Sequence, residues 1–274
     1  MISFSVKKIS IVIAAFFLIV AVFVFRDKIS ALFSFGPDFS PVNPQEISLP
    51  PSRSAPSAED QKSKVVKNEA PSYTGRDPQE VRSSPEEVKL FSAEQKEKIY
   101  GELRMHGSAV KEKPDYFFGW IQVGLLKKVI GDFEGARDAW EYAGVISPKN
   151  SVSFANLGEL YWRYIPNFPK SEENFKISIK NKPNDPSTYM SLSDLYSYSY
   201  AEKKDLADDI LFEGIAANPD SLDLTKYLAR LYETEGKFSL ALVWWQKVLE
   251  KDPQNSEVVT TIESLKKKVE VKPQ

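Results

Sequence analysis

Residues 154–183 read FANLGELYWRYIPNFPKSEENFKISIKNKP, and this stretch decides the fold. Phe154 begins it, a Leu-Gly pair follows at 157–158, and Pro183 closes it. Apolar and small residues recur at helical spacing in two blocks, which the turn around Pro166 separates. Because proline cannot continue a helix, Pro183 marks the end of the second block. The stretch therefore predicts two helices joined by a turn.

The same pattern returns along the chain. Prolines at 148, 183, 219 and 253 follow one another at spacings of 35, 36 and 34 residues. Reading back from each proline gives an aromatic residue, small residues and a second aromatic in similar places, as in Trp120, Gly124, Ala136 and Trp140. A period near 34 with W-x2-L-G-x2-Y, A-x3-F and a closing proline resembles the tetratricopeptide repeat family. The resemblance covers Phe117 to Pro253, which is 137 of 274 residues.

Three departures from the family pattern stand out. The turn of the second repeat has one extra residue, the turn of the third (SYSYAEKKD) has two, and Thr225 replaces the first aromatic of the fourth. These changes affect only the local geometry of the turns between helices. The resemblance therefore implies an all-α solenoid of stacked helix pairs, because one pair cannot bury its own apolar face.

The resemblance divides the folded part, 92–271, into four repeats between two capping helices. The repeats are expected at about 117–150, 151–185, 186–221 and 222–255, and the capping helices at about 92–112 and 256–270. Ser92 and Gln95 predict a capping box at the start of the first capping helix. His106 falls where that helix would place a large buried residue, so it is interpreted as a packing residue.

An apolar run predicts a membrane anchor near the N-terminus, within 1–35. Ile9 to Phe25 contains seventeen residues without a charge, between Lys7-Lys8 and Arg26-Asp27-Lys28. At ~1.5 Å per residue this run spans ~26 Å, near the lower limit for crossing a bilayer core. A cleaved signal peptide is the alternative, although its apolar region is usually shorter and ends at a small-residue cleavage site. We expect an uncleaved single-pass anchor in a bacterial plasma membrane, with the C-terminal domain outside the cytoplasm.

A linker is predicted between the anchor and the repeats. Residues 36–91 contain nine of the eighteen prolines, many serines and charges of both signs. Such a composition does not offset the conformational entropy lost on ordering, so the segment is expected to be disordered. The alternative interpretation is a docking strip for another protein.

The composition excludes several kinds of chemistry. The chain has no Cys and one His, so it has no thiolate nucleophile and no zinc site of Cys and His ligands. Its 36 Lys and Arg against 38 Asp and Glu give a net charge of −2, which argues against nucleic-acid binding. No phosphate-binding glycine motif occurs. We expect a protein that is not an enzyme and that has no catalytic residue, cofactor or metal.

The resemblance implies a concave groove lined by the first helix of each repeat. The candidate groove residues are Phe118, Ile121, Leu125, Asn156, Glu159, Trp162, Met190, Asp194, Tyr198, Lys226 and Arg230. Lys226 and Arg230 lie four residues apart on one helix, where two cations repel unless an anion lies between them. Either Glu233 or Asp223 supplies that anion internally, or the pair binds an acidic peptide.

The predicted function is a membrane-anchored scaffold that binds a protein or peptide in the groove and assists assembly of an envelope complex. The bilayer would be contacted through residues 9–25. One alternative is a structural subunit with a constitutive partner or with a second copy of itself. Another is an accessory repeat domain of a cell-envelope enzyme system.

Overall fold

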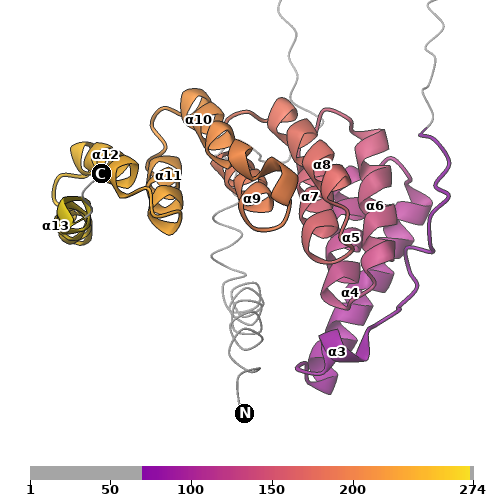
Figure 1. Cartoon of the computed structure of the whole chain (residues 1–274). Coiled ribbons are helices and arrows are strands. Elements are labelled where there is room, and N and C mark those ends of the chain that lie inside the picture. The colour runs from indigo at the N-terminus through magenta and orange to yellow at the C-terminus, as the bar shows by residue number, and fades with distance from the viewer. Residues whose placement is uncertain (1–69, 272–274) are drawn as a thin grey trace, which may run out of the picture. The chain divides into compact units, whose positions relative to one another are not determined.

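The computed structural model describes residues 70–271, and all regular secondary structure in this range is helical (Figure 1). The prediction of an all-α fold is confirmed for these residues. The described residues belong to one compact unit. None of the helices described is both long enough and apolar enough to cross a bilayer. The predicted anchor, 9–25, lies outside the described residues and stays a prediction.

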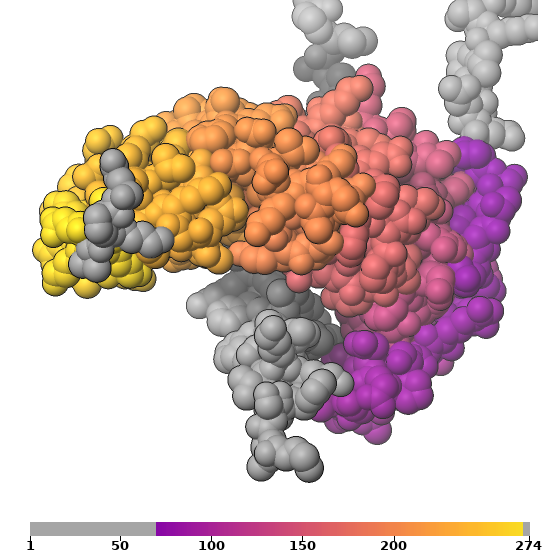
Figure 2. Space-filling view, in the orientation of Figure 1, coloured from indigo at the N-terminus to yellow at the C-terminus, as the bar shows by residue number. Residues whose placement is uncertain are grey.

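Four pairs of helices follow one another along the chain. The pairs are α5 (Phe117–Val129) with α6 (Phe133–Ile146), α7 (Val152–Arg163) with α8 (Phe168–Asn181), α9 (Pro186–Tyr198) with α10 (Ala207–Ala217), and α11 (Leu222–Thr234) with α12 (Phe238–Lys251). They are preceded by α3 (Pro85–Val88) and α4 (Ala93–Glu112) and followed by α13 (Ser256–Val271). Figure 2 shows the surface colours in sequence order, as expected when each pair contacts only its neighbours.

Local sequence signals fix the helix ends. The Ser92 side chain accepts a hydrogen bond from the Gln95 backbone, and the Gln95 side chain accepts one from the Ser92 backbone. The predicted capping box of α4 is therefore confirmed. Between α5 and α6, Gly131 has a φ of +83°, which favours glycine, and Asp132 caps α6 by accepting from the Gly135 backbone at 3.0 Å.

Small residues allow the two helices of a pair to approach closely. A Cβ atom added to Gly124 would lie 2.2 Å from the Trp140 ring, and one added to Gly158 would lie 2.5 Å from the Phe175 ring. The Trp140 indole is fully buried and donates to the backbone carbonyl of Ile121 at 3.2 Å. The recurring small and aromatic residues thus reflect how a large ring on the second helix fits over a glycine on the first.

The prediction that the linker extends to Phe91 is wrong. Residues 70–84, here called the arm, lie against α4, α5 and α6 (Figure 1). The Tyr73 ring lies 4.4 Å from the Trp120 ring, and Tyr142 donates to the backbone carbonyl of Pro71 at 2.7 Å. The arm is rich in proline and serine, but its aromatic ring and several of its charged side chains find partners on the fold, which offsets the entropy lost on ordering.

Charged groups also hold the arm. Arg76 forms an ion pair with Asp138 of α6 at 2.7 Å, and Asp77 forms one with Lys111 of α4 at 2.7 Å. Lys127 of α5 is fully buried and donates to the Glu80 carbonyl at 3.0 Å. The arm therefore contacts α6, α5 and α4 and belongs to the folded unit.

His106 is only partly buried, so it is not the large buried residue that its position in α4 predicted. The buried face of α4 is made by Ile99, Leu103, Gly107 and Val110. Gly107 is buried by the arm, because a Cβ atom there would lie 2.7 Å from the backbone of Pro78. The sequence pattern did not include the arm, so it did not show that Gly107 would be covered by the arm.

The lengthened third turn has a structure of its own. Residues Ala201–Leu206 form a 3-10 helix, η1, and α10 has 11 residues where α8 has 14. Lys203 of η1 contacts the Glu172 carboxylate of α8 at 2.6 Å, and Tyr196 donates to the same carboxylate at 2.9 Å. Burial opposes ionisation of Glu172, but the hydrogen bonds from Lys176, Lys203 and Tyr196 hold its pKa below the usual value.

Candidate functional site

The first helices of neighbouring repeats lie beside one another. Helix α9 contacts both α7 and α11. Side chains also link them: Lys128 lies 3.4 Å from Glu159, and Trp162 donates to the Ser199 hydroxyl at 2.8 Å. The surface formed by the solvent-facing residues of α5, α7, α9 and α11, here called the first-helix face, is the counterpart of the predicted groove.

Large apolar side chains lie exposed on the first-helix face. Phe118 is 66% exposed, Tyr198 is 65% exposed and Leu125 is 39% exposed. Of the other predicted groove residues, Arg230 is exposed, and five are partly exposed: Asn156, Glu159, Met190, Asp194 and Lys226. These residues are therefore placed where a ligand of the first-helix face can touch them.

Two predicted groove residues belong to the core instead. Ile121 and Trp162 are each only 9% exposed. Ile121 packs in the cluster around Trp120 and Trp140, and Trp162 packs in the cluster around Leu195 and Tyr196. Trp162 is further covered by Arg163, whose guanidinium carbon lies 3.7 Å from the ring centroid. Spacing along a helix did not reveal this, because the cover comes from a neighbouring side chain.

Arg163 and Tyr227, which helical spacing also places on the first helices' groove side, both act on Asp194. Tyr227 of α11 donates a hydrogen bond to the Asp194 carboxylate of α9. Burial raises the pKa of Asp194 above its ordinary value, and the hydrogen bond and the charge of Arg163 counteract this only in part. Burial, together with the bond to Asp194, also raises the pKa of Tyr227.

The cations Lys226 and Arg230 line a small cleft at the end of the array. The cleft has a volume of about 40 Å³, and its other walls come from Trp245 of α12, from Asn255, and from Glu257, Val258 and Thr261 of α13. Arg230 lies 6.0 Å from the centre of the Trp245 ring. Within the described residues, neither cation forms an ion pair with a carboxylate.

The internal neutralisation of this cation pair is not observed. Glu233 accepts a hydrogen bond from the Trp245 indole at 2.9 Å and forms no ion pair with Arg230 in the described part of the chain. Asp223 forms none with Lys226 there either. The pair therefore faces the cleft with its charge available. Over residues 70–271, no cluster of His, Asp and Glu has an arrangement that could hold a metal ion.

The comparisons with known proteins identify no family. No protein-family model matches the chain, and no curated protein matches it. Among solved structures, MamA is similar, with a TM-score of 0.49 and 18% identity over 60% of this chain and 94% of that one. TTC0263, a thermophilic TPR protein of Thermus thermophilus, matches with a TM-score of 0.43 and 17% identity, over 65% of this chain and 94% of its own. YrrB, described as a TPR protein with an unusual peptide-binding site, has a TM-score of 0.43 and 15% identity, over 58% and 81%. Because these TM-scores are below 0.5 and the identities below 25%, the architecture is inferred from the helix pairs of this chain alone.

Proposed function

We propose that the chain is a non-catalytic interaction scaffold that binds a segment of a partner protein along the first-helix face. The observation that carries this proposal is the exposure of Phe118 and Tyr198, about two-thirds of each, on the first helices of separate repeats. Aromatic side chains are enriched at protein interfaces, where they contribute much of the binding energy.

The charge of the fourth repeat favours an acidic partner segment. Lys226 and Arg230 have no carboxylate partner among the described residues, and both line the cleft beside Trp245. An acidic side chain between them would relieve their mutual repulsion. The proposed ligand therefore combines apolar residues, which contact Phe118 and Tyr198, with an acidic residue at Lys226 and Arg230.

Photo-crosslinking in the cells that make the protein tests this function. A photoreactive phenylalanine replaces Phe118 or Tyr198 in the full chain, and Phe212 of α10, which is 40% exposed but lies outside the first-helix face, serves as the control position. We expect one defined adduct from positions 118 and 198 and none of that mass from 212. Lys226→Glu with Arg230→Glu should reduce the adduct at least tenfold, because two favourable contacts become repulsive.

A matched pair on α13 controls for net charge. Lys266 and Lys267 are exposed and form no ion pair in the described part of the chain, so Lys266→Glu with Lys267→Glu makes the same charge change elsewhere. This variant should keep the adduct. An adduct that survives the change at 226 and 230 would exclude the acidic ligand, and equal adducts at 118 and 212 would exclude the first-helix face.

We propose further that residues 9–25 anchor the scaffold in a bilayer, with the repeats outside the cytoplasm of a bacterial cell. The uncharged run from Ile9 to Phe25 supports this proposal. In membrane fractionation at alkaline pH, the full chain should sediment with the membranes, and a chain without 9–25 should not. Recovery of the full chain in the supernatant, or a mature N-terminus beyond Ala31, would contradict the anchor.

A further inference from the structure

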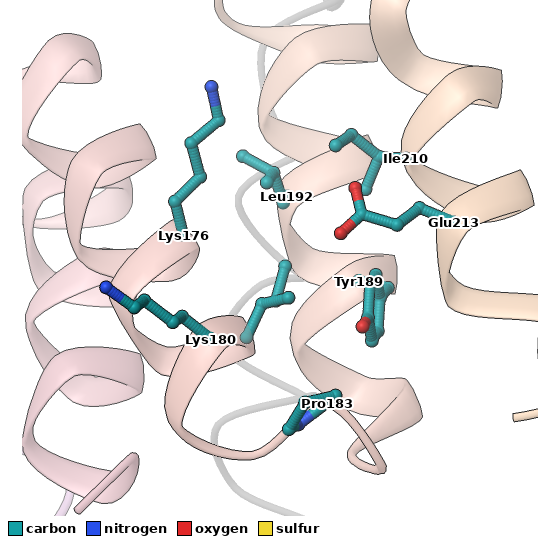
Figure 3. A pocket seen from close by; sticks show the side chains of 8 residues that line it. Lys176, Lys180, Pro183, Tyr189, Leu192, Ile210 and Glu213 are labelled. Carbon is teal, nitrogen blue, oxygen red and sulfur yellow. The ribbon is translucent and has the colours of Figure 1, made fainter. Parts of the chain in front are cut away.

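A cavity lies on the other side of the array, among the second helices. It has a volume of about 390 Å³ and lies between α8, α9 and α10. Figure 3 shows Lys176 and Lys180 coming from one helix and Ile210 and Glu213 from the helix opposite. Ile179, Leu192 and Tyr189 also line the cavity, although each of them is less than 10% exposed. The volume is within the range of small ligand sites.

The repeat places this cavity in register with the site that holds the arm. Lys180 lies three residues before Pro183, as Lys111 lies three before Pro114. Tyr189 lies six residues after Pro183, as Trp120 lies six after Pro114. On the following helix, Glu213 and Tyr142 each lie six residues before the next proline. We call each such space a slot; it lies over the first helix of a repeat, between the second helix of that repeat and the helix that precedes the repeat, which is α4 for the first repeat.

The arm shows what kind of segment a slot binds. In its slot, the Tyr73 ring lies 4.4 Å from Trp120 and 5.3 Å from Tyr142. Four residues further on, Asp77 pairs with Lys111 at 2.7 Å. Between them, Arg76 pairs with Asp138 at 2.7 Å. A non-helical segment that bends at Gly75 and Arg76 is therefore held in the slot by one aromatic ring and two opposite charges.

The slot of the fourth repeat is closed by the chain's own rings. Phe212 and Trp244 lie with their centroids 5.6 Å apart. Phe212 lies seven residues before the following proline, as Lys176 does, and Trp244 lies nine before it, as Ile210 does. In the cavity these two positions therefore carry no aromatic ring. The slot over α9, here called the open slot, is thus neither filled by the arm nor closed by aromatic side chains.

We propose that the open slot binds a non-helical segment of a partner protein that carries an aromatic residue, then a basic residue three positions later and an acidic residue four positions later. Tyr189 and Leu192 are already buried, so the aromatic ring would pack on the partly exposed Ile210 and on the methylene groups of Lys176 and Lys180. The acidic residue would pair with Lys180, which corresponds to Lys111. The basic residue would pair with Asp209, which lies ten residues before Pro219 as Asp138 lies ten before Pro148.

The charges of the open slot are available for these contacts. Within the described residues, Lys180 and Glu213 form no ion pair, and the Asp209 side chain forms none either. Lys176 is already paired with Glu172 at 2.6 Å. Lys176 occupies the repeat position that Gly107 has in α4, where the backbone of the arm lies close to the helix. Because a lysine side chain takes up this space in α8, the backbone of the partner must lie farther from α8 than the arm lies from α4.

A partner protein fits the open slot better than a second copy of this chain. The arm of each copy is held in its own slot by Tyr73, Arg76 and Asp77, and a tethered segment competes at an effective concentration near the millimolar range. The open slot also lies on second helices, so this inference does not depend on the first-helix face. Changes at 226 and 230 should leave it intact.

The arm sequence itself supplies the probe. A fluorescent peptide of residues 70–80, APSYTGRDPQE, is titrated into the full chain and its anisotropy is measured. We expect saturable binding that Ile210→Trp abolishes, because a ring at this position should close the slot as Trp244 does. Tyr73→Ala in the peptide should weaken binding at least tenfold, since the aromatic ring carries the buried area.

Charge reversal tests the register. Lys180→Glu should weaken binding about fivefold, the upper range for one exposed ion pair. The peptide with Asp77→Lys should bind this variant better than it binds the unchanged chain. Lys149→Glu, an exposed position just after the end of α6, is the matched control and should have no effect. Thermal unfolding of each variant checks that the fold is kept.

Three results would overturn the proposal. One is the absence of saturable binding, and another is equal binding by the Ile210→Trp and unchanged chains. The third is a concentration-dependent dimer, measured by light scattering, that Ile210→Trp dissolves, because a second copy would then occupy the slot. None of these results affects the crosslinks from Phe118 and Tyr198, so the two proposals fail separately.

Discussion

Asp132→Ala is expected to lower the free energy of unfolding by about 3–5 kcal/mol, because it leaves a buried charge without its partner. Lys127 is fully buried, and its ammonium group lies 2.7 Å from the Asp132 carboxylate. The same carboxylate caps α6 through Gly135, and caps contribute about 1 kcal/mol on their own. The midpoint of urea unfolding, followed by tryptophan fluorescence, measures the loss.

An exposed ion pair provides the control. Lys89 and Glu86 lie 2.6 Å apart but are 58% and 80% exposed, so Lys89→Ala should cost no more than about 0.5 kcal/mol. Lys127→Met combined with Asp132→Leu removes both buried charges and should recover a large part of the loss. Equal midpoints for Asp132→Ala and Lys89→Ala would show that the buried pair does not hold the first repeat.

Trp140→Ala is expected to cost about 3–5 kcal/mol, the usual range for removing a fully buried aromatic side chain. The indole fills the space over Gly124 and donates to the Ile121 carbonyl. Its loss would leave a cavity between α5 and α6 that the close helix pair cannot collapse to fill. Thermal unfolding monitored by circular dichroism measures the effect.

Trp244→Ala is the matched control for this prediction. Trp244 is only partly buried and contacts Phe212 and Lys247 near the surface of α12. Its removal should cost about 1 kcal/mol or less, in proportion to its smaller buried area. Similar losses from the two tryptophan variants would contradict the assignment of Trp140 to the core of the array.

The sequence predicted the helices because its residues carry local constraints. Prolines at 148, 183, 219 and 253 mark where second helices end, and small residues such as Gly124 and Gly158 mark where rings pack. Each of these signals acts within about 35 residues, one repeat of the family pattern. The capping box at Ser92 was predictable for the same reason.

The arm was not predictable from composition. Residues 70–84 have the proline and charge content of a linker, and their order comes from partners far along the chain. Tyr142 bonds to Pro71 across 71 positions, and Asp138 bonds to Arg76 across 62. No periodic pattern connects residues at such distances. For the same reason, the sequence did not predict that the arm would lie against Gly107.

The sequence predicted which helices carry the candidate site, but it predicted the exposure of only some of its residues. Helical spacing placed Phe118, Tyr198 and Arg230 on the outside, where the structure has them. It did not foresee that Ile121 and Trp162 would be covered, since this depends on how neighbouring helices pack and on Arg163. The open slot lies beside α10, which is shorter than the other second helices. The two extra residues in the third turn indicated an altered geometry there, but they did not predict the slot.

The seat of the arm also determines how the fold meets mechanical load. A pull applied at residue 70 reaches the Tyr142–Pro71 hydrogen bond first, then the Arg76–Asp138 pair, then Asp77 with Lys111. Because these contacts follow one another along a single non-helical stretch of chain, a pull would load them in that order, before it reaches the hydrogen bond between Lys127 and Glu80. Helices α6 and α4, which hold the partner side chains, would bear the tension before α5 does.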